Sequence, residues 1–116
     1  MALSAQQALQ IWRGAVVESV RRDGPDLTAR QMAVLTTVYL EPPPHTVRGL
    51  AEQLSISKPA VTRALDRLST LELVRRKTDE IDRRSVNVQR TVRGSLFLSD
   101  FADLIRRASA DLPPED

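Results

Sequence analysis

The chain has 116 residues, which suits one domain with a core of its own and leaves no room for a second, catalytic domain. It contains no cysteine, so disulfides, thiol catalysis, thiol redox sensing and cysteine-ligated zinc are excluded. The net charge is only +2, but residues 46–93 carry eleven basic side chains against six acidic ones. Because no apolar run is long enough to cross a membrane and no signal-peptide pattern is seen, we expect a cytoplasmic protein.

The first helix is expected at residues 4–22. Ser4 and Gln7 have the spacing of a capping box, in which each residue bonds the backbone of the other. Apolar residues follow at steps of three and four, which gives the helix one apolar stripe: Leu9, Trp12, Val16 and Val20. Trp12 is therefore expected in the core or in a subunit interface.

A second, shorter helix is expected to end at Leu40. Thr28 and Gln31 form a second capping-box pair, placed after an Asp-Gly-Pro-Asp break. Three consecutive prolines at 42–44 end this helix, because proline disfavours helical conformation in the residue before it. His45 lies beside them with no metal-ligating partners nearby, so we expect it on the surface of a loop.

Residues 46–71 have the pattern of a helix-turn-helix, two short helices joined by a three-residue turn. Ser57 can cap the second helix, whose apolar residues recur at helical spacing. Its outer face carries four polar side chains suited to phosphates and base edges in a major groove: Lys58, Thr62, Arg63 and Arg67. The alternative is an ordinary helical hairpin with a solvated basic face.

Two short strands are expected next, at residues 73–77 and 85–90, with a polar hairpin tip at 78–84. Strands placed directly after such a helix form a wing, and the arginines at its tip suit a minor groove. The alternative is a solvated hairpin whose charges only favour solubility.

The last helix is expected from a cap at Thr91 to about Ala108, followed by an acidic tail at 112–116. Together the first and last helices carry more apolar surface than one small core can cover, which predicts a homodimer. The expected dimerisation residues are Leu9, Trp12, Val16, Val20, Phe97, Phe101, Leu104 and Ile105.

With these elements placed, the sequence closely resembles the MarR family of winged helix-turn-helix regulators over about residues 27–105. The matching positions are Leu27, Thr28, Gln31, residues 50–54, 56–63, 65–68, 73–76 and 82–84, Val88, Thr91 and Gly94. The resemblance implies a dimer held by its terminal helices. It also implies recognition helices in successive major grooves of a pseudo-palindromic operator, and wing arginines at the flanking minor grooves.

The resemblance assigns groove-facing positions to six residues: Ser57, Lys58, Pro59, Ala60, Thr62 and Arg63. With the outward-facing Arg67 and the wing residues Arg83 and Arg84, they make up the expected DNA-binding set. The resemblance further implies that Asp82 orients the wing arginines, with Arg84 in the minor groove and Arg83 nearer phosphate.

Three features depart from the family pattern. Ser55 and Glu72 stand where glycine is usual, so the ends of the two motif helices are expected to be strained or rebuilt. The final helix is short for the family, which affects the size of the dimer interface. The peroxide-sensing branch is excluded because there is no cysteine, and the few aromatic residues do not indicate a small-molecule effector.

We therefore predict a mainly α fold with a small β wing, organised as a single winged-helix domain over residues 1–116. The predicted function is that of a sequence-specific DNA-binding transcriptional regulator, a repressor, which binds as a dimer without a cofactor. The alternative is a winged-helix module for protein association. An enzyme is disfavoured, because Asp79, Glu80 and Asp82 have no nucleophile or metal-ligand set nearby.

Overall fold

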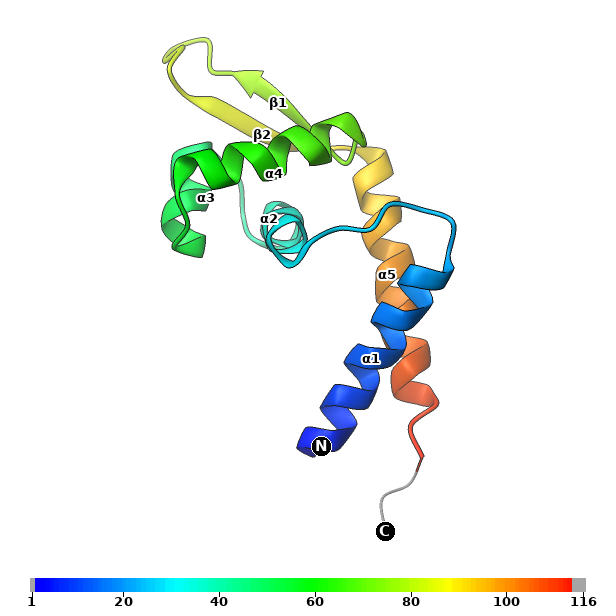
Figure 1. Cartoon of the computed structure of the whole chain (residues 1–116). Helices are drawn as coiled ribbons and strands as arrows, with labels where there is room; N and C mark the ends of the chain where they lie inside the picture. Colours follow the sequence, from blue (N-terminus) through cyan, green and yellow to red (C-terminus); the bar gives the residue numbers. More distant parts are fainter. Residues whose placement is uncertain (1, 114–116) are drawn as a thin grey trace. The chain divides into compact units, whose positions relative to one another are not determined.

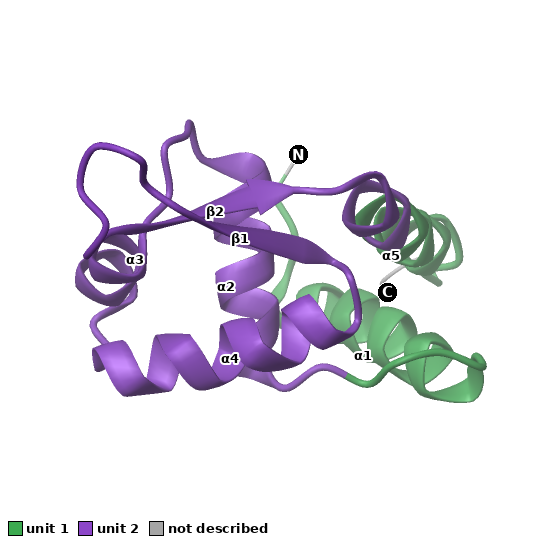
Figure 2. Ribbon diagram, turned by 90° about the horizontal axis from the view of Figure 1, so that it is seen from above, with its two compact units in different colours: residues 1–26, 98–116 green, residues 27–97 purple. Residues whose placement is uncertain are grey.

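The computed structural model describes residues 2–113 of the chain and is mainly α-helical with one antiparallel hairpin, as predicted (Figure 1). The elements in chain order are α1 (Ala5–Arg21), α2 (Ala29–Leu40), α3 (Val47–Leu54), α4 (Lys58–Thr70), β1 (Val74–Thr78), β2 (Val86–Arg90) and α5 (Val92–Ala110). The end of the predicted acidic tail, 114–116, lies outside the described residues. The chain divides into two compact units, residues 27–97 and the segments before and after them (Figure 2).

The unit formed by residues 27–97 contains the helix-turn-helix and the hairpin. Helix α4 contacts α2, α3 and β1 (Figure 2). The largest fully buried side chains all come from these three helices: Val34, Leu35, Val38, Leu50, Val61, Leu65 and Leu68. Strands β1 and β2 pair with Arg76 opposite Val88, and Val74 and Val88 are buried. One apolar core therefore fixes both the second motif helix and the base of the wing.

The predicted helix caps are confirmed. Ser4 and Thr28 each form a capping box with the glutamine three residues later. In α4, the Ser57 hydroxyl accepts a hydrogen bond from the Ala60 amide at 3.2 Å, and Pro59 occupies the first turn. These bonds satisfy amides that have no partner inside the helix, so local sequence fixes where the helices begin.

Both motif helices end in a left-handed residue that is not glycine. Ser55 has φ 55° and Glu72 has φ 61°, as expected where the family pattern has glycine. After α4, the Glu72 amide donates to the Ser69 carbonyl and the Leu73 amide to the Leu68 carbonyl, both at 2.9 Å. This is the Schellman pattern of hydrogen bonds, which usually has glycine at the left-handed position. The caps therefore keep their usual hydrogen bonds, and the backbones of Ser55 and Glu72 are strained because these residues carry a Cβ.

His45 is buried, with 6 % of its surface exposed, so the prediction of a surface position is wrong. Its carbonyl accepts a hydrogen bond from the Val88 amide at 2.8 Å, and its Nε2 lies 3.0 Å from the Glu41 carbonyl oxygen. The segment after the prolines is thus held against β2 through its backbone.

Tyr39 joins three segments of the same unit. Its hydroxyl accepts a hydrogen bond from the Thr91 amide at 2.8 Å and lies 2.7 Å from the Leu73 carbonyl oxygen, to which it can donate. Gly94 passes so close that an added Cβ would collide with the Tyr39 hydroxyl and the Leu73 carbonyl. The beginning of α5 is therefore fixed to the turn between α4 and β1.

In the other unit, α1 packs against the later part of α5. Ala15 and Leu104 are buried, and a Cβ on Gly14 would lie 2.8 Å from the Ala108 Cβ, which shows how closely the two helices approach. Leu104 is covered within the chain, so its expected place in a subunit interface is wrong. Leu9, Trp12 and Val20 are exposed, and Trp12 is therefore not a core residue of this chain.

Candidate nucleic-acid interface

Helix α4 exposes one basic face. Its apolar residues are buried against α2, α3 and β1, while Lys58, Thr62, Arg63 and Arg67 are exposed at helical spacing. Within residues 2–113, none of the three basic side chains among them forms an ion pair. Their charge is therefore available to an external anion.

The first turn of α4 presents Ser57 and Pro59, both exposed, beside Lys58. Ala60 differs from the prediction, because only 7 % of its surface is exposed. The Ala60 amide already has a partner within the chain, since it donates to the Ser57 hydroxyl. Ala60 therefore belongs to the packed side of the helix, and its assignment as a groove-facing side chain is wrong.

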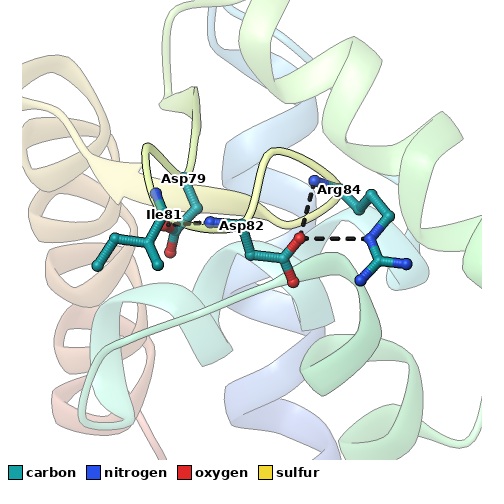
Figure 3. Close-up of polar contacts among 4 residues, drawn as sticks. All are labelled: Asp79, Ile81, Asp82 and Arg84. Atoms are coloured by element: carbon teal, nitrogen blue, oxygen red, sulfur yellow. Dashed lines mark hydrogen bonds and ion pairs between the residues drawn. The ribbon is translucent and has the colours of Figure 1, made fainter.

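The hairpin tip is organised by Asp79. Its Oδ1 accepts hydrogen bonds from the amides of Ile81 at 2.8 Å and Asp82 at 3.2 Å (Figure 3). The Asp79 amide donates to the Ser85 carbonyl across the tip at 2.9 Å. The amides of Asp82 and then Ile81 stabilise the ionised carboxylate and lower the pKa of Asp79. Our sequence reasoning missed this role, although an aspartate that opens a polar turn is a recognised signal.

Asp82 contacts Arg84, in agreement with the geometry that the resemblance implies. Its Oδ1 accepts from the Arg84 amide at 3.1 Å and lies 3.5 Å from Nε of the same residue (Figure 3). The Arg84 side chain nevertheless stays 95 % exposed, and Arg83 is exposed beside it. The tip thus presents two arginines to solvent.

Other arginines in the basic stretch have internal partners. Arg76 forms a 2.8 Å ion pair with Asp66 and so links β1 to α4. Arg90 donates to the carbonyls of Val38 and Glu41 at the end of α2. These side chains position the wing and the helix, and they leave Lys58, Arg63, Arg67, Arg75, Lys77 and Arg83 without ion pairs within residues 2–113.

Over the same residues, no cluster of histidine and acidic side chains could hold a metal ion. None of the described helices combines the length and apolar character needed to cross a membrane. The features that stand out are a helix-turn-helix with a basic outer face and a hairpin wing with exposed arginines. They define a winged helix-turn-helix protein.

Residues 27–86 match the sequence model of the MarR family, which is more than half of the chain. The protein belongs to the MarR family, a family of transcriptional regulators, and the resemblance inferred from the sequence is confirmed. No curated protein matches the chain in sequence.

Solved structures share this fold. The chain is similar to YusO from Bacillus subtilis, with 26% identity and a TM-score of 0.74 over 91% of this chain and 74% of that one. It is also similar to the transcriptional regulator BldR from Sulfolobus solfataricus, with 28% identity and a TM-score of 0.62 over 92% and 80%. A mutant of S. aureus MepR has 20% identity and a TM-score of 0.72 over 91% and 79%, which shows a common fold.

Proposed function

We propose that this protein is a sequence-specific transcriptional repressor that binds a pseudo-palindromic operator as a homodimer. The observation that carries the proposal is the set of exposed cations without internal ion pairs on α4 and the wing. Both elements belong to one compact unit, and the Arg76–Asp66 pair fixes one to the other. A module that binds only proteins would not need basic side chains on both elements able to enter DNA grooves.

Each element has its own role in this proposal. The major-groove set on α4 consists of Ser57, Lys58, Pro59, Thr62, Arg63 and Arg67. Of these, Arg63 is exposed near the middle of α4, where it can reach base edges or adjacent phosphates. Arg84 enters the minor groove with Asp82 controlling its direction, and Arg83 contacts phosphate.

The proposed dimer interface is made by the terminal helices. Leu9, Trp12 and Val20 are exposed in the single chain, which is an aggregation liability unless a partner covers them. Val16, Phe97 and Phe101 are half-buried and Ile105 is exposed, so they can complete the interface. A twofold dimer would present two copies of α4 to the two halves of an operator.

The test compares three arginine variants on the duplex that the purified protein selects from a random pool. Arg63→Ala should weaken binding by about 1–3 kcal/mol and relax the preference at one base position. Arg84→Ala should weaken binding to many sequences more evenly and reduce the salt slope by about one unit. Arg30→Ala is the matched control, because Arg30 is an exposed arginine on α2 with no ion pair within residues 2–113, and it lies outside α4, the wing and the terminal helices.

Binding that is unchanged by Arg63→Ala and by Arg84→Ala would refute the proposed interface. Equal losses in all three variants would show that only total charge matters. That result would refute sequence-specific reading by α4.

A further inference from the structure

A cleft in the unit of residues 27–97 lies outside the set of groove-reading residues. The end of α4, the first residues of β1 and the beginning of α5 border this cleft, which has a volume of about 580 Å³. Most of the side chains that line it are polar or charged: Ser69, Glu72, Arg75, Arg76, Thr91 and Arg93. Because three of them are arginines and one is an acid, the lining carries a net positive charge.

The three arginines keep hydrogen-bond donors for an external group. Arg75 is exposed and has no ion pair within residues 2–113. The pair between Arg93 and Glu72 spans 3.4 Å with both side chains more than half exposed, so water screens it. Arg76 contacts Asp66 through Nη1 alone, and a guanidinium has five N–H donors. An oxyanion that enters the cleft can therefore be bound without breaking these pairs.

The free edge of β1 adds a backbone donor. Arg76 lies opposite Val88, and the Val88 amide donates to the His45 carbonyl on the side of β2 away from β1. Val88 and Arg76 are therefore a pair without mutual hydrogen bonds, so the Arg76 amide also points away from the ladder. No residue within 2–113 accepts a hydrogen bond from this amide. The edge of β1 that borders the cleft thus presents an unpaired N–H group.

Helices α4 and α5 contribute further donors. Helix α5 begins at Val92 with no acidic residue in its first turn. The Thr91 hydroxyl accepts from the Gly94 amide at 2.9 Å, which leaves the amides of Val92 and Arg93 without a helical partner. On α4, Ser69 Oγ is the one buried side-chain oxygen or nitrogen within residues 2–113 that has no hydrogen-bond partner. Donors from three elements therefore border one positively charged cleft.

We propose that this cleft binds a phosphate group, carried either by the DNA backbone or by a small phosphorylated molecule. A tetrahedral oxyanion accepts hydrogen bonds in several directions, which suits guanidinium, amide and hydroxyl donors that come from separate elements. The volume of the cleft also leaves space for part of the molecule that carries the phosphate. The inference goes beyond operator recognition, because binding of a free phosphate does not require DNA.

The first experiment titrates inorganic phosphate into the DNA-free protein at constant ionic strength, with chloride as the exchanged anion, and follows the amide NMR signals. The amides of Arg76, Val92 and Arg93 should show the largest saturable shifts. Arg93→Gln should weaken phosphate binding about fivefold or more, and Arg93→Lys, which keeps the charge, should weaken it less. Ser69→Ala should weaken it about two- to threefold without lowering the melting temperature, because the hydroxyl has no partner in the chain.

Arg30→Gln is the matched control for this titration. Arg30 is an exposed arginine on α2, in the same compact unit, and has no ion pair within residues 2–113. Its variant should bind phosphate as wild type does. Because Arg75 and Arg93 are also exposed, their variants should melt close to wild type, so a loss of binding cannot be assigned to unfolding.

The second experiment identifies the source of the phosphate by titrating the selected duplex in a phosphate-free buffer. If a DNA phosphate occupies the cleft, Arg75→Gln and Arg93→Gln should each reduce the salt slope by about one unit, whereas Arg30→Gln should not. If a small molecule occupies it, both cleft variants should keep the wild-type slope while the DNA-free wild type still binds phosphate. Either result supports the phosphate site and assigns its ligand.

Two results of the first experiment would overturn the inference. Phosphate affinities that are equal in Arg93→Gln and Arg30→Gln would show that only the total charge of the protein attracts the anion. Amide shifts that chloride reproduces, or that spread evenly over all exposed arginines, would show that the cleft has no phosphate site. A wild type that selects no duplex would refute the proposed function alone, because the phosphate titration contains no DNA.

Discussion

Replacement of Glu72 by glycine is expected to stabilise the protein. Glu72 is left-handed with φ 61°, which costs a side-chain-bearing residue about 1–2 kcal/mol. Glycine removes this cost but adds about 0.5–1 kcal/mol of unfolded-state entropy. The Glu72–Arg93 ion pair is also lost, but it spans 3.4 Å with side chains 70% and 67% exposed, so it contributes about 0–0.5 kcal/mol. The net gain is about 0.5 kcal/mol.

Glu72→Ala is the matched control, because it loses the same ion pair but keeps the Cβ and the strain. Urea unfolding followed by circular dichroism should place Glu72→Gly above Glu72→Ala by about 1 kcal/mol, or about 4 °C in melting temperature. The backbone bonds that Glu72 makes, to Ser69 and Thr91, are unchanged in both variants. If the glycine variant is no more stable than the alanine variant, the left-handed residue carries no strain and the reasoning fails.

Three further predictions concern the contacts described above. Tyr39→Phe should lose about 1–2 kcal/mol in urea unfolding, because the Thr91 amide loses its acceptor; equal stability would show that the hydroxyl is dispensable. The pKa of Asp79 in the folded state is below its ordinary value of 3.8, so its ionised carboxylate stabilises the fold fully above pH 3.8. This contribution to the free energy of unfolding is lost as the pH falls through the folded-state pKa. The stability difference between wild type and Asp79→Asn should therefore shrink on acidification, and a constant difference would contradict this. Sedimentation at about micromolar concentration should find a dimer for wild type and a monomer for Trp12→Arg, whereas a well-behaved wild-type monomer would exclude the dimer.

The elements that short-range sequence determines were predicted closely. The two capping boxes and the Ser57 cap need only residues three apart, so Ser4, Thr28 and Ser57 identify where helices begin. The left-handed conformations at Ser55 and Glu72 were expected from the resemblance, because glycine is usual at these two positions in the family.

The features that depend on distant contacts were not predictable in the same way. His45 follows prolines in a loop, and the bond between its carbonyl and the amide of Val88, 43 positions later, is a distant contact that the sequence does not indicate. Leu104 and Ile105 are adjacent in one apolar stripe, yet packing against α1 buries the first and leaves the second exposed. A stripe identifies an apolar face but does not say which of its residues the chain itself covers.

The roles of individual site residues were predicted with mixed success. The exposure of Lys58, Arg63 and Arg67 follows from helical periodicity, because the opposite face is apolar. Ala60 was assigned to the groove by the resemblance, although it lies four residues before the buried Ala64 and so falls on the packed face of the helix.

Selection of bound duplexes from a random pool by the purified wild-type protein tests the central claim most directly. The account predicts enrichment of a motif with two half-sites related by a pseudo-twofold axis, centred about 10 base pairs apart and flanked by A·T-rich sequence. A folded protein that enriches no motif would contradict the DNA-binding function, and an association surface for an acidic protein partner would then be the better account of the basic faces of α4 and the wing.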